Sequence, residues 1–202
     1  MPGVRQAKAA ETEAALKAAA KEVFAERGYL NTKITDITAA AGRAAGSFYN
    51  HFAGKEELLQ ALLADLLAET DVAVEADSEH DQDFTARAAI RYHVAFYFRF
   101  FRANRTVMVA LYQAAMVDRS FAATLNELSA PDIGHMAEHL DHVQRTGHEL
   151  PGEPLAVARA IGTLLWGFAH ALLVERSLGD LTEEAAVDLV TDLIHRGVAG
   201  RV

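Results

Sequence analysis

Apolar residues recur along most of this chain at the three- and four-residue spacing of amphipathic α-helices. The first helical pattern runs from Glu11 to Arg27 and is ended by Gly28, and a later one follows Lys55. Further helices are expected over residues 84–103, 106–116, 121–144, 154–178 and 182–198, and the acidic tract 77–83 is expected to be a solvated loop. With the segment described next, the pattern predicts an all-α fold of about nine helices.

Between the first two helices lie two short helical patterns joined by a bend that begins at Gly42. Isoleucines share one side of the first pattern, and Phe48 and Phe52 share one side of the second, so both apolar sides can face inward together. If Phe48 marks the buried direction, Arg43, Gly46 and Asn50 project from the opposite side. This arrangement is typical of a helix-turn-helix, whose second helix enters the major groove of DNA.

The outward side of the second short helix suits contact with duplex DNA. Asn50 can pair with an adenine edge, and Gly46 lets the backbone approach the duplex closely. Tyr49, His51 and Lys55 lie beside this side and are expected to hold phosphates, Lys55 together with the free N–H groups of the helix that it begins. The residues expected to contact DNA are Lys33, Thr35, Arg43, Ala45, Gly46, Ser47, Tyr49, Asn50, His51 and Lys55.

At these residues the chain resembles the TetR family of bacterial transcriptional regulators. The matching residues are Thr32, Ile34, Asp36, Ile37, Ala41, Gly42, Gly46, Tyr49, His51, Phe52, Lys55, Glu56 and Leu58. The resemblance implies an N-terminal three-helix DNA-binding domain over residues 1–56, with the helix-turn-helix motif at about 33–52. It also implies a C-terminal helical ligand-binding and dimerisation domain over residues 57–202. The implied protein is a homodimer, a repressor by expectation, whose affinity for a palindromic operator is switched off by a small ligand.

Three residues in the motif depart from the family pattern. Lys33 and Ala44 stand where Ser or Thr usually caps each short helix, and Arg43 stands where a small apolar residue usually fills the turn. Loss of such a cap typically costs about 1 kcal/mol. Asp36 is expected to compensate by reaching back to the backbone N–H of Lys33. Since Ala45 replaces a residue that is often basic, Arg43 is expected to supply part of the missing positive charge.

The chain has 19 Lys and Arg residues against 28 Asp and Glu, a net charge of −9, which by itself disfavours DNA binding. The charge is uneven along the chain. Residues 1–58 hold eight basic and seven acidic residues, whereas residues 59–202 hold eleven and twenty-one, and every Lys occurs at or before Lys55. DNA binding is therefore expected to depend on the placement of a few cations and on dimeric avidity.

Composition and motifs also argue against other classes of protein. The absence of cysteine excludes a disulfide framework and thiol catalysis. The first residues lack the apolar core of a signal peptide, and no unbroken apolar run approaches the ~20 residues needed to cross a bilayer, so a cytoplasmic location is expected. There is no nucleophile elbow, phosphate-binding glycine loop or HExxH motif, so neither enzymatic activity nor a cofactor is expected.

Residues 155–174 are apolar on nearly every side, with Gly162 and Gly167 allowing close helix approach. This helix is expected to need a partner and to form, with the helix capped by Thr182, a four-helix interface in a homodimer. The alternative is a monomer in which this helix is simply buried. The residues expected at the dimer interface are Ile161, Leu165, Phe168, Leu172, Val190 and Ile194.

An effector pocket is expected in the C-terminal domain, with a largely apolar and adaptable lining. The candidate lining residues are Phe96, Phe100, Met108, Tyr112, Met116, Met136, Trp166 and His170. A ligand there is expected to displace the leucine-lined helix after Lys55 and so change the spacing of the two DNA-binding domains. The alternative is a DNA-binding protein without an effector.

Two other interpretations of the C-terminal residues remain open. Aromatic residues mixed with Arg99, Arg102 and Arg105 can stack on single-stranded nucleic acid, but their helical spacing favours a core or a cavity. His135, His139 and His142 share one sector of a predicted helix with Asp132, and neighbouring histidines at this spacing can bind zinc or nickel. His135 and His142 are about 10 Å apart along the axis, so a metal-responsive regulator needs ligands from another helix as well.

Overall fold

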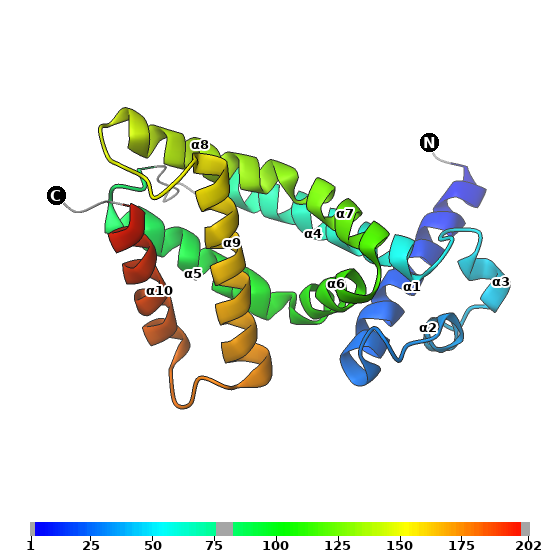
Figure 1. Ribbon diagram of the computed structural model, residues 1–202. Coiled ribbons are helices and arrows are strands. Elements are labelled where there is room, and N and C mark those ends of the chain that lie inside the picture. Colours follow the sequence, from blue (N-terminus) through cyan, green and yellow to red (C-terminus); the bar gives the residue numbers. More distant parts are fainter. Residues whose placement is uncertain (1–2, 76–82, 199–202) are drawn as a thin grey trace. The chain divides into compact units, whose positions relative to one another are not determined.

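The computed structural model describes residues 3–75 and 83–198, and within these ranges it contains helices and no strand (Figure 1). The α-helices are α1 (Val4–Arg27), α2 (Ile34–Ala40), α3 (Ala45–Phe48), α4 (Lys55–Glu75), α5 (Arg87–Ala103), α6 (Arg105–Val117), α7 (Arg119–Leu128), α8 (Ala130–Arg145), α9 (Pro154–His170) and α10 (Glu183–Val198). The π-helix η1 (Ala171–Glu175) extends α9. The expected all-α fold is confirmed. Most of the acidic tract expected to be a loop lies outside the described residues.

The chain groups into two compact units. The first unit consists of Met1–Val72 and Thr106–Leu128, and the second consists of Ala73–Arg105 and Ser129–Val202. Helices α6 and α7 therefore group with the helix-turn-helix segment. The functional division expected near residue 56 stays a prediction, because it concerns which part binds DNA rather than which helices pack together.

The first unit has a core of aliphatic and aromatic side chains from α1 to α4. The predicted apolar stripe of α1 is confirmed, since its members Leu16, Ala20, Val23 and Phe24 are all buried. The leucines of α4 are buried as expected, namely Leu58, Leu59, Leu62, Leu63 and Leu66. Helix α1 begins at Val4 rather than near Glu11. We call α1, α2, α3 and the start of α4 the head.

The second unit is built from α5, α8, α9 and α10, with α8 against α9 and α5 against α10. A Cβ atom placed on Gly162 of α9 would lie 3.4 Å from Cδ1 of Ile133 on α8, so the expected close approach at this glycine is confirmed. Ion pairs join α5 to α10: Arg87 Nε lies 2.7 Å from Asp192 and Arg91 Nε lies 2.8 Å from Asp188. Acidic residues of α10 thus neutralise arginines of α5.

Two expected helices differ in the structure. The helix expected over 121–144 is divided at Ser129, because Pro131 lies in the first turn of α8, where its ring and missing N–H prevent continuation from α7. The helix expected over 154–178 is α-helical only to His170 and then widens into η1, which ends at Arg176 with a φ of 54°. The sequence analysis predicted neither the division at Ser129 nor the change to a π-helix after His170.

Helix α9 and its continuation η1 form one 22-residue helical segment, Pro154–Glu175, that is long and apolar enough by length and composition to span a membrane. Its mean hydropathy is 1.6. The segment contains Arg159, so it is not an unbroken apolar run, and the expectation that no such run approaches ~20 residues is not contradicted. Core and interface helices of soluble proteins share these properties, so the segment is weak evidence for a membrane.

Candidate nucleic-acid interface

The turn between α2 and α3 is closed by backbone hydrogen bonds that require glycine. Gly42 has a φ of 63°, in the left-handed region, and its N–H donates to the carbonyl of Ala39 over 3.1 Å. The N–H of Arg43 donates to the carbonyl of Thr38 over 2.9 Å. This six-to-one bond is the Schellman ending of a helix, and it turns the chain sharply into α3. The Gly-led bend expected from the sequence is thus present.

The start of α2 is held by Asp36 instead of by a capping hydroxyl. The Lys33 N–H donates to Oδ2 of Asp36 over 2.9 Å, as expected, and Oδ1 of the same carboxylate lies 3.0 Å from Nη1 of Arg27. A lysine side chain has no acceptor, so only the carboxylate half of a capping box exists here. Ala44 likewise provides no side-chain cap for α3. Asp36 therefore links the start of α2 to the end of α1.

Helix α3 is anchored by aromatic residues and presents a sparse outward face. Phe48 is fully buried and its ring centroid lies 5.6 Å from that of Phe52. On the outward side Tyr49 is 61% exposed, and a Cβ atom added at Gly46 would meet nothing within 4 Å. Of the other residues expected to contact DNA, Lys33, Thr35, Ala45 and Asn50 are exposed, whereas Ser47 and His51 are half-buried. A duplex could therefore approach the backbone of α3 closely.

Lys55 occupies a different environment from the one expected for a free phosphate ligand. Its Nζ donates to the carbonyls of Tyr29 over 2.9 Å and Thr32 over 2.7 Å, and it lies 4.4 Å from the centroid of the Tyr29 ring. Burial lowers the pKa of Lys55, and the neighbouring Glu56 carboxylate opposes that shift. Two of the three ammonium donors are thus used to hold the loop between α1 and α2.

Tyr29 connects this loop to two other helices, which sequence patterns did not indicate. Its hydroxyl donates to Oε1 of Glu56 over 2.7 Å, and its backbone N–H donates to Oε1 of Gln113 on α6 over 3.1 Å. Burial and the Glu56 carboxylate raise the pKa of Tyr29, so the phenol stays protonated and donates. Because Gln113 is 84 residues from Tyr29, no local pattern predicts this bond. It joins α6 directly to the head.

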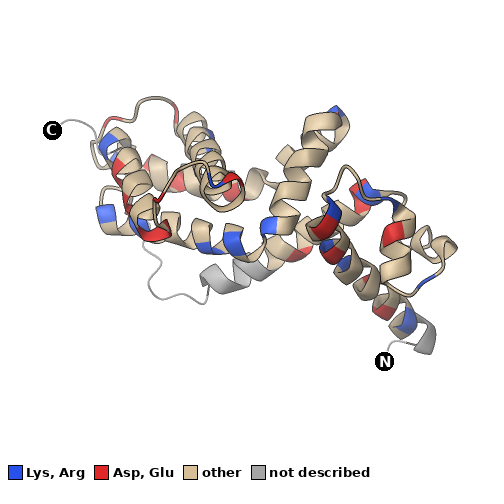
Figure 2. Ribbon diagram, turned by 90° about the horizontal axis from the view of Figure 1, so that it is seen from below, with Lys and Arg blue, Asp and Glu red and all other residues tan. Residues whose placement is uncertain are grey.

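Arg43 also forms an ion pair within the protein. Its Nη2 lies 3.0 Å from Oε1 of Glu11 on α1. Figure 2 shows basic and acidic residues interspersed over the helices of the head, without a wide basic field. Glu11 is a second residue that sequence reasoning missed, because it precedes the motif by several helical turns.

Comparison with known proteins supports the interpretation of this surface. Residues 16–62 match the family model for bacterial regulatory proteins of the tetR family. The transcriptional repressor DhaR of Mycobacterium sp. (strain GP1) is 51% identical over 49 residues, which are 22% of this chain and 25% of that protein. A TetR-family regulator from Syntrophomonas wolfei has a similar structure, with a TM-score of 0.74, 18% identity, and coverage of 95% of this chain and 97% of the other.

Residues 16–62 of this chain thus match the DNA-binding domain of the TetR family, and its fold is TetR-like. Its relatives are transcriptional regulators rather than enzymes. The sequence match spans about a quarter of the first curated relative, so the sequence likeness rests on the head, whereas the fold likeness covers nearly the whole chain. A third similar protein is the FadR regulator of Bacillus subtilis in complex with stearoyl-CoA, with a TM-score of 0.70, 18% identity, and coverage of 91% and 98%.

The residues expected to line an effector pocket come from several helices. Phe96 and Phe100 lie on α5, Met136 on α8, and Trp166 and His170 on α9, and all are half-buried. The remaining candidates, Met108, Tyr112 and Met116, lie on α6, where Tyr112 and Met116 are exposed. Trp166 stacks on His170 with centroids 4.8 Å apart. Their role as a pocket stays a prediction.

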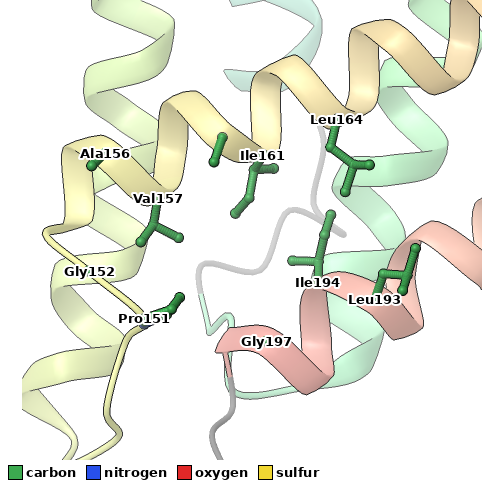
Figure 3. Close-up of a pocket in the computed structure, with 10 residues that line it drawn as sticks. Pro151, Gly152, Ala156, Val157, Ile161, Leu164, Leu193, Ile194 and Gly197 are labelled. Atoms are coloured by element: carbon green, nitrogen blue, oxygen red, sulfur yellow. The ribbon is translucent and has the colours of Figure 1, made fainter.

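The structure contains an apolar groove of about 400 Å³ between α9 and α10 (Figure 3). Side chains of the two helices, among them Ile161, Leu164 and Ile194, face one another across it. None of the eight predicted pocket residues lines this groove. The groove instead includes Ile161 and Ile194 from the predicted dimer interface.

Four of the six predicted interface residues, Ile161, Leu165, Val190 and Ile194, are buried in the single chain, and their place in an interface stays a prediction. Leu165 and Val190 are 4% and 0% exposed, so they have little surface for a partner. Helix α9 packs against α8 and α5, and α10 packs against α5. Phe168 and Leu172 are half-buried. Exposed apolar surface is supplied instead by three leucines that the sequence analysis did not select, Leu155, Leu189 and Leu193.

The three histidines of α8 lie in different environments. His135 and His142 are exposed, whereas His139 is buried with its ring centroid 5.4 Å from that of His93 on α5. Among the side chains that the structure describes, no three from His, Asp or Glu are arranged to hold a metal ion. The metal-responsive alternative therefore has no ligand set in the part of the chain that the structure describes.

Proposed function

We propose that this TetR-family protein is a cytoplasmic transcriptional repressor that binds a palindromic operator as a homodimer and is released by a small, largely apolar effector. The observation that carries the DNA-binding part is the outward side of α3. Gly46 of α3 and Asn50, two residues after the end of α3, are exposed, whereas Phe48 of α3 is fully buried. A short, bare and polar helix face anchored by a buried aromatic residue suits the major groove.

Within this proposal the outward residues have different tasks. Asn50 reads a base edge, because its amide can pair bidentately with adenine. Tyr49 contacts the phosphate backbone, as do the exposed Lys33 and Thr35 at the start of α2. Lys55 has one ammonium donor beyond its two carbonyl bonds, so it contributes at most one phosphate contact without releasing the loop that it holds.

Replacement of Asn50 and of Tyr49 by Ala tests these tasks. Binding of wild type and variants is measured on duplexes selected by the wild type from a random library and on single-base changes of those duplexes. Asn50→Ala is expected to relax preference at one base position in each half-site, by about 1–3 kcal/mol of lost discrimination. Tyr49→Ala is expected to weaken binding to all sequences alike. Equal and sequence-independent losses from both variants would contradict the assigned tasks.

The dimer is proposed to form through α9 and α10. Leu155, Leu189 and Leu193 are 47%, 44% and 53% exposed, and the adjoining groove is lined mostly by apolar residues. Gly167 of α9 has open space around its Cβ position, so another helix can approach its backbone. A two-fold axis through this face produces a four-helix interface and places two heads on two half-sites.

The effector part of the proposal is supported by the half-buried aromatic residues of α5 and by the FadR regulator of Bacillus subtilis, which binds stearoyl-CoA. We infer an effector with a long apolar portion. The bond between Gln113 and Tyr29 provides a route by which a shift of α6 reaches the head. A thermal-shift series with acyl chains of increasing length tests this, because a ligand of the folded state raises the midpoint of unfolding. Unchanged midpoints at saturating concentrations of every chain length would refute it.

A further inference from the structure

One cation of the helix-turn-helix is already paired within the protein. The guanidinium of Arg43, in the turn before α3, has its Nη2 atom 3.0 Å from Oε1 of Glu11 on α1. The Arg43 side chain is 34% exposed and that of Glu11 is 71% exposed. Ion pairs in contact with water are weak, so another anion can replace Glu11 at Arg43.

The ion pair with Glu11 does not engage every N–H donor of the Arg43 guanidinium. Arg43 Nε is shielded from solvent and has no hydrogen-bond partner among the described residues. A shielded donor without an acceptor raises the free energy of this arrangement. A guanidinium presents its donors as a planar fork that fits two oxygens of one phosphate. A DNA phosphate therefore offers Arg43 a more complete partner than the single Glu11 oxygen.

The positive charge of Arg43 matters because the motif and the start of α4 contain few cations. The motif and the start of α4 contain three basic side chains: Lys33, Arg43 and Lys55. Lys33 is exposed, but the ammonium of Lys55 is bound to two backbone carbonyls. While Arg43 is paired with Glu11 and Lys55 holds two carbonyls, Lys33 is the exposed cation that the motif and the start of α4 present to an approaching duplex. The phosphate contribution to affinity then depends on whether Arg43 is released.

We propose that Glu11 sets the DNA affinity of the head by competing with a DNA phosphate for Arg43. This inference rests on the proposed DNA-binding function. In the free protein Arg43 pairs with Glu11, and in the complex it exchanges that carboxylate for a phosphate. Glu11 is a positioning residue, since it acts through Arg43 and has no required contact with DNA. Because phosphate contacts carry no sequence information, the competition weakens the hold on operator and random DNA alike.

The test compares Glu11→Gln, Arg43→Gln and the double variant. Glu22→Gln serves as a matched control, because Glu22 is an exposed carboxylate on the same helix. The probes are a labelled duplex selected by the wild type and a labelled random-sequence duplex, titrated by fluorescence anisotropy at several KCl concentrations. Glu11→Gln is expected to tighten binding about threefold per protomer on both probes, more than Glu22→Gln does. Arg43→Gln is expected to reduce the salt slope by about 0.9 per protomer.

The double variant decides whether the effect passes through Arg43. Glu11→Gln should add no more than Glu22→Gln does when Arg43 is absent. An equal gain with and without Arg43, or no gain from Glu11→Gln alone, would overturn the inference while leaving the proposed DNA binding intact. If the wild type binds neither probe, the proposed function and this inference both fail. If circular dichroism shows that Arg43→Gln does not fold, Arg43→Met replaces it, because it keeps the aliphatic stem in the turn.

Discussion

The head and the α9–α10 face expose opposite kinds of surface. In the head the largest side chain of α3, Phe48, is fully buried, and the outward side holds Gly46 and Asn50. On α9 and α10 leucines such as Leu155 and Leu193 remain about half exposed beside an apolar groove. The first surface matches a hydrated polar duplex, whereas the second gains by excluding water. One chain thus carries one surface that suits DNA and another that suits a protein partner.

The two regions also use their charges differently. In the second unit Asp188 and Asp192 of α10 pair with arginines of α5, so part of the acidic excess is used to join two helices. In the head Glu11 and Asp36 pair with Arg43 and Arg27, so acidic residues hold cations near the proposed DNA surface. The net charge of −9 is therefore a poor guide to DNA binding here. The location of each cation and its acidic partner decide whether it can contact DNA.

The largest expected effect comes from removing the anchor of the head. Phe48→Ala should destabilise the first unit by about 3–5 kcal/mol, because it leaves a cavity under α3. DNA binding should be lost while self-association through α9 and α10 remains. Denaturant unfolding, gel shift and light scattering measure these three properties. Tyr49→Ala is the comparison, since this exposed side chain should affect DNA affinity with little change in stability. If Phe48→Ala bound DNA as tightly as the wild type, DNA binding would not depend on the fold of the head, which would contradict this prediction.

A charge on the α9–α10 face should separate the subunits. Leu193→Asp places a carboxylate in the proposed interface, and the dissociation constant should rise about a hundredfold, which corresponds to about 2.7 kcal/mol. Leu30→Asp is a closely matched control, because Leu30 in the head is also 53% exposed. Sedimentation equilibrium distinguishes the two. Dissociation by both variants, or by neither, would argue against an interface on this face.

The sparse face of α3 can be filled without disturbing the fold. Gly46→Ala adds a methyl group into open space and should leave the unfolding midpoint unchanged or slightly higher. DNA affinity should fall about tenfold per head, or about 1.4 kcal/mol, because the backbone can no longer approach as closely. Gly134→Ala on α8 is the control, since its Cβ position is also open. Unchanged DNA affinity for Gly46→Ala would place the duplex elsewhere on the head.

The smallest expected effect concerns the bond between α6 and the head. Gln113→Ala removes the acceptor of the Tyr29 N–H and should cost about 1 kcal/mol of local stability. Hydrogen exchange at the Tyr29 amide should become faster. Gln144→Ala, an exposed glutamine on α8, should leave this exchange unchanged. Equal protection of Tyr29 in the variant and wild type would show that α6 does not support the head through this bond.

Much of the head was predictable, because its determinants are local. The positive φ of Gly42, the buried Phe48 and the bond from the Lys33 N–H to Asp36 all follow from residues within a few positions of one another. The second unit was less predictable. Leu165 and Val190 fit an interface by periodicity, but helix rotation places them in the core. A long apolar helix can turn several faces inward, and its sequence does not select which one.

The amino-acid sequence by itself determined the helical class, the glycine-led turn and the bare outward face of α3, because each depends on spacing within one or two helical turns. Only the tertiary structure decided that Arg43 rests on Glu11, that Lys55 holds the Tyr29 loop, and that Gln113 links α6 to the head. These contacts join residues 26 to 84 positions apart in the chain. Such pairings depend on how whole helices pack, which no local pattern of polar and apolar residues specifies.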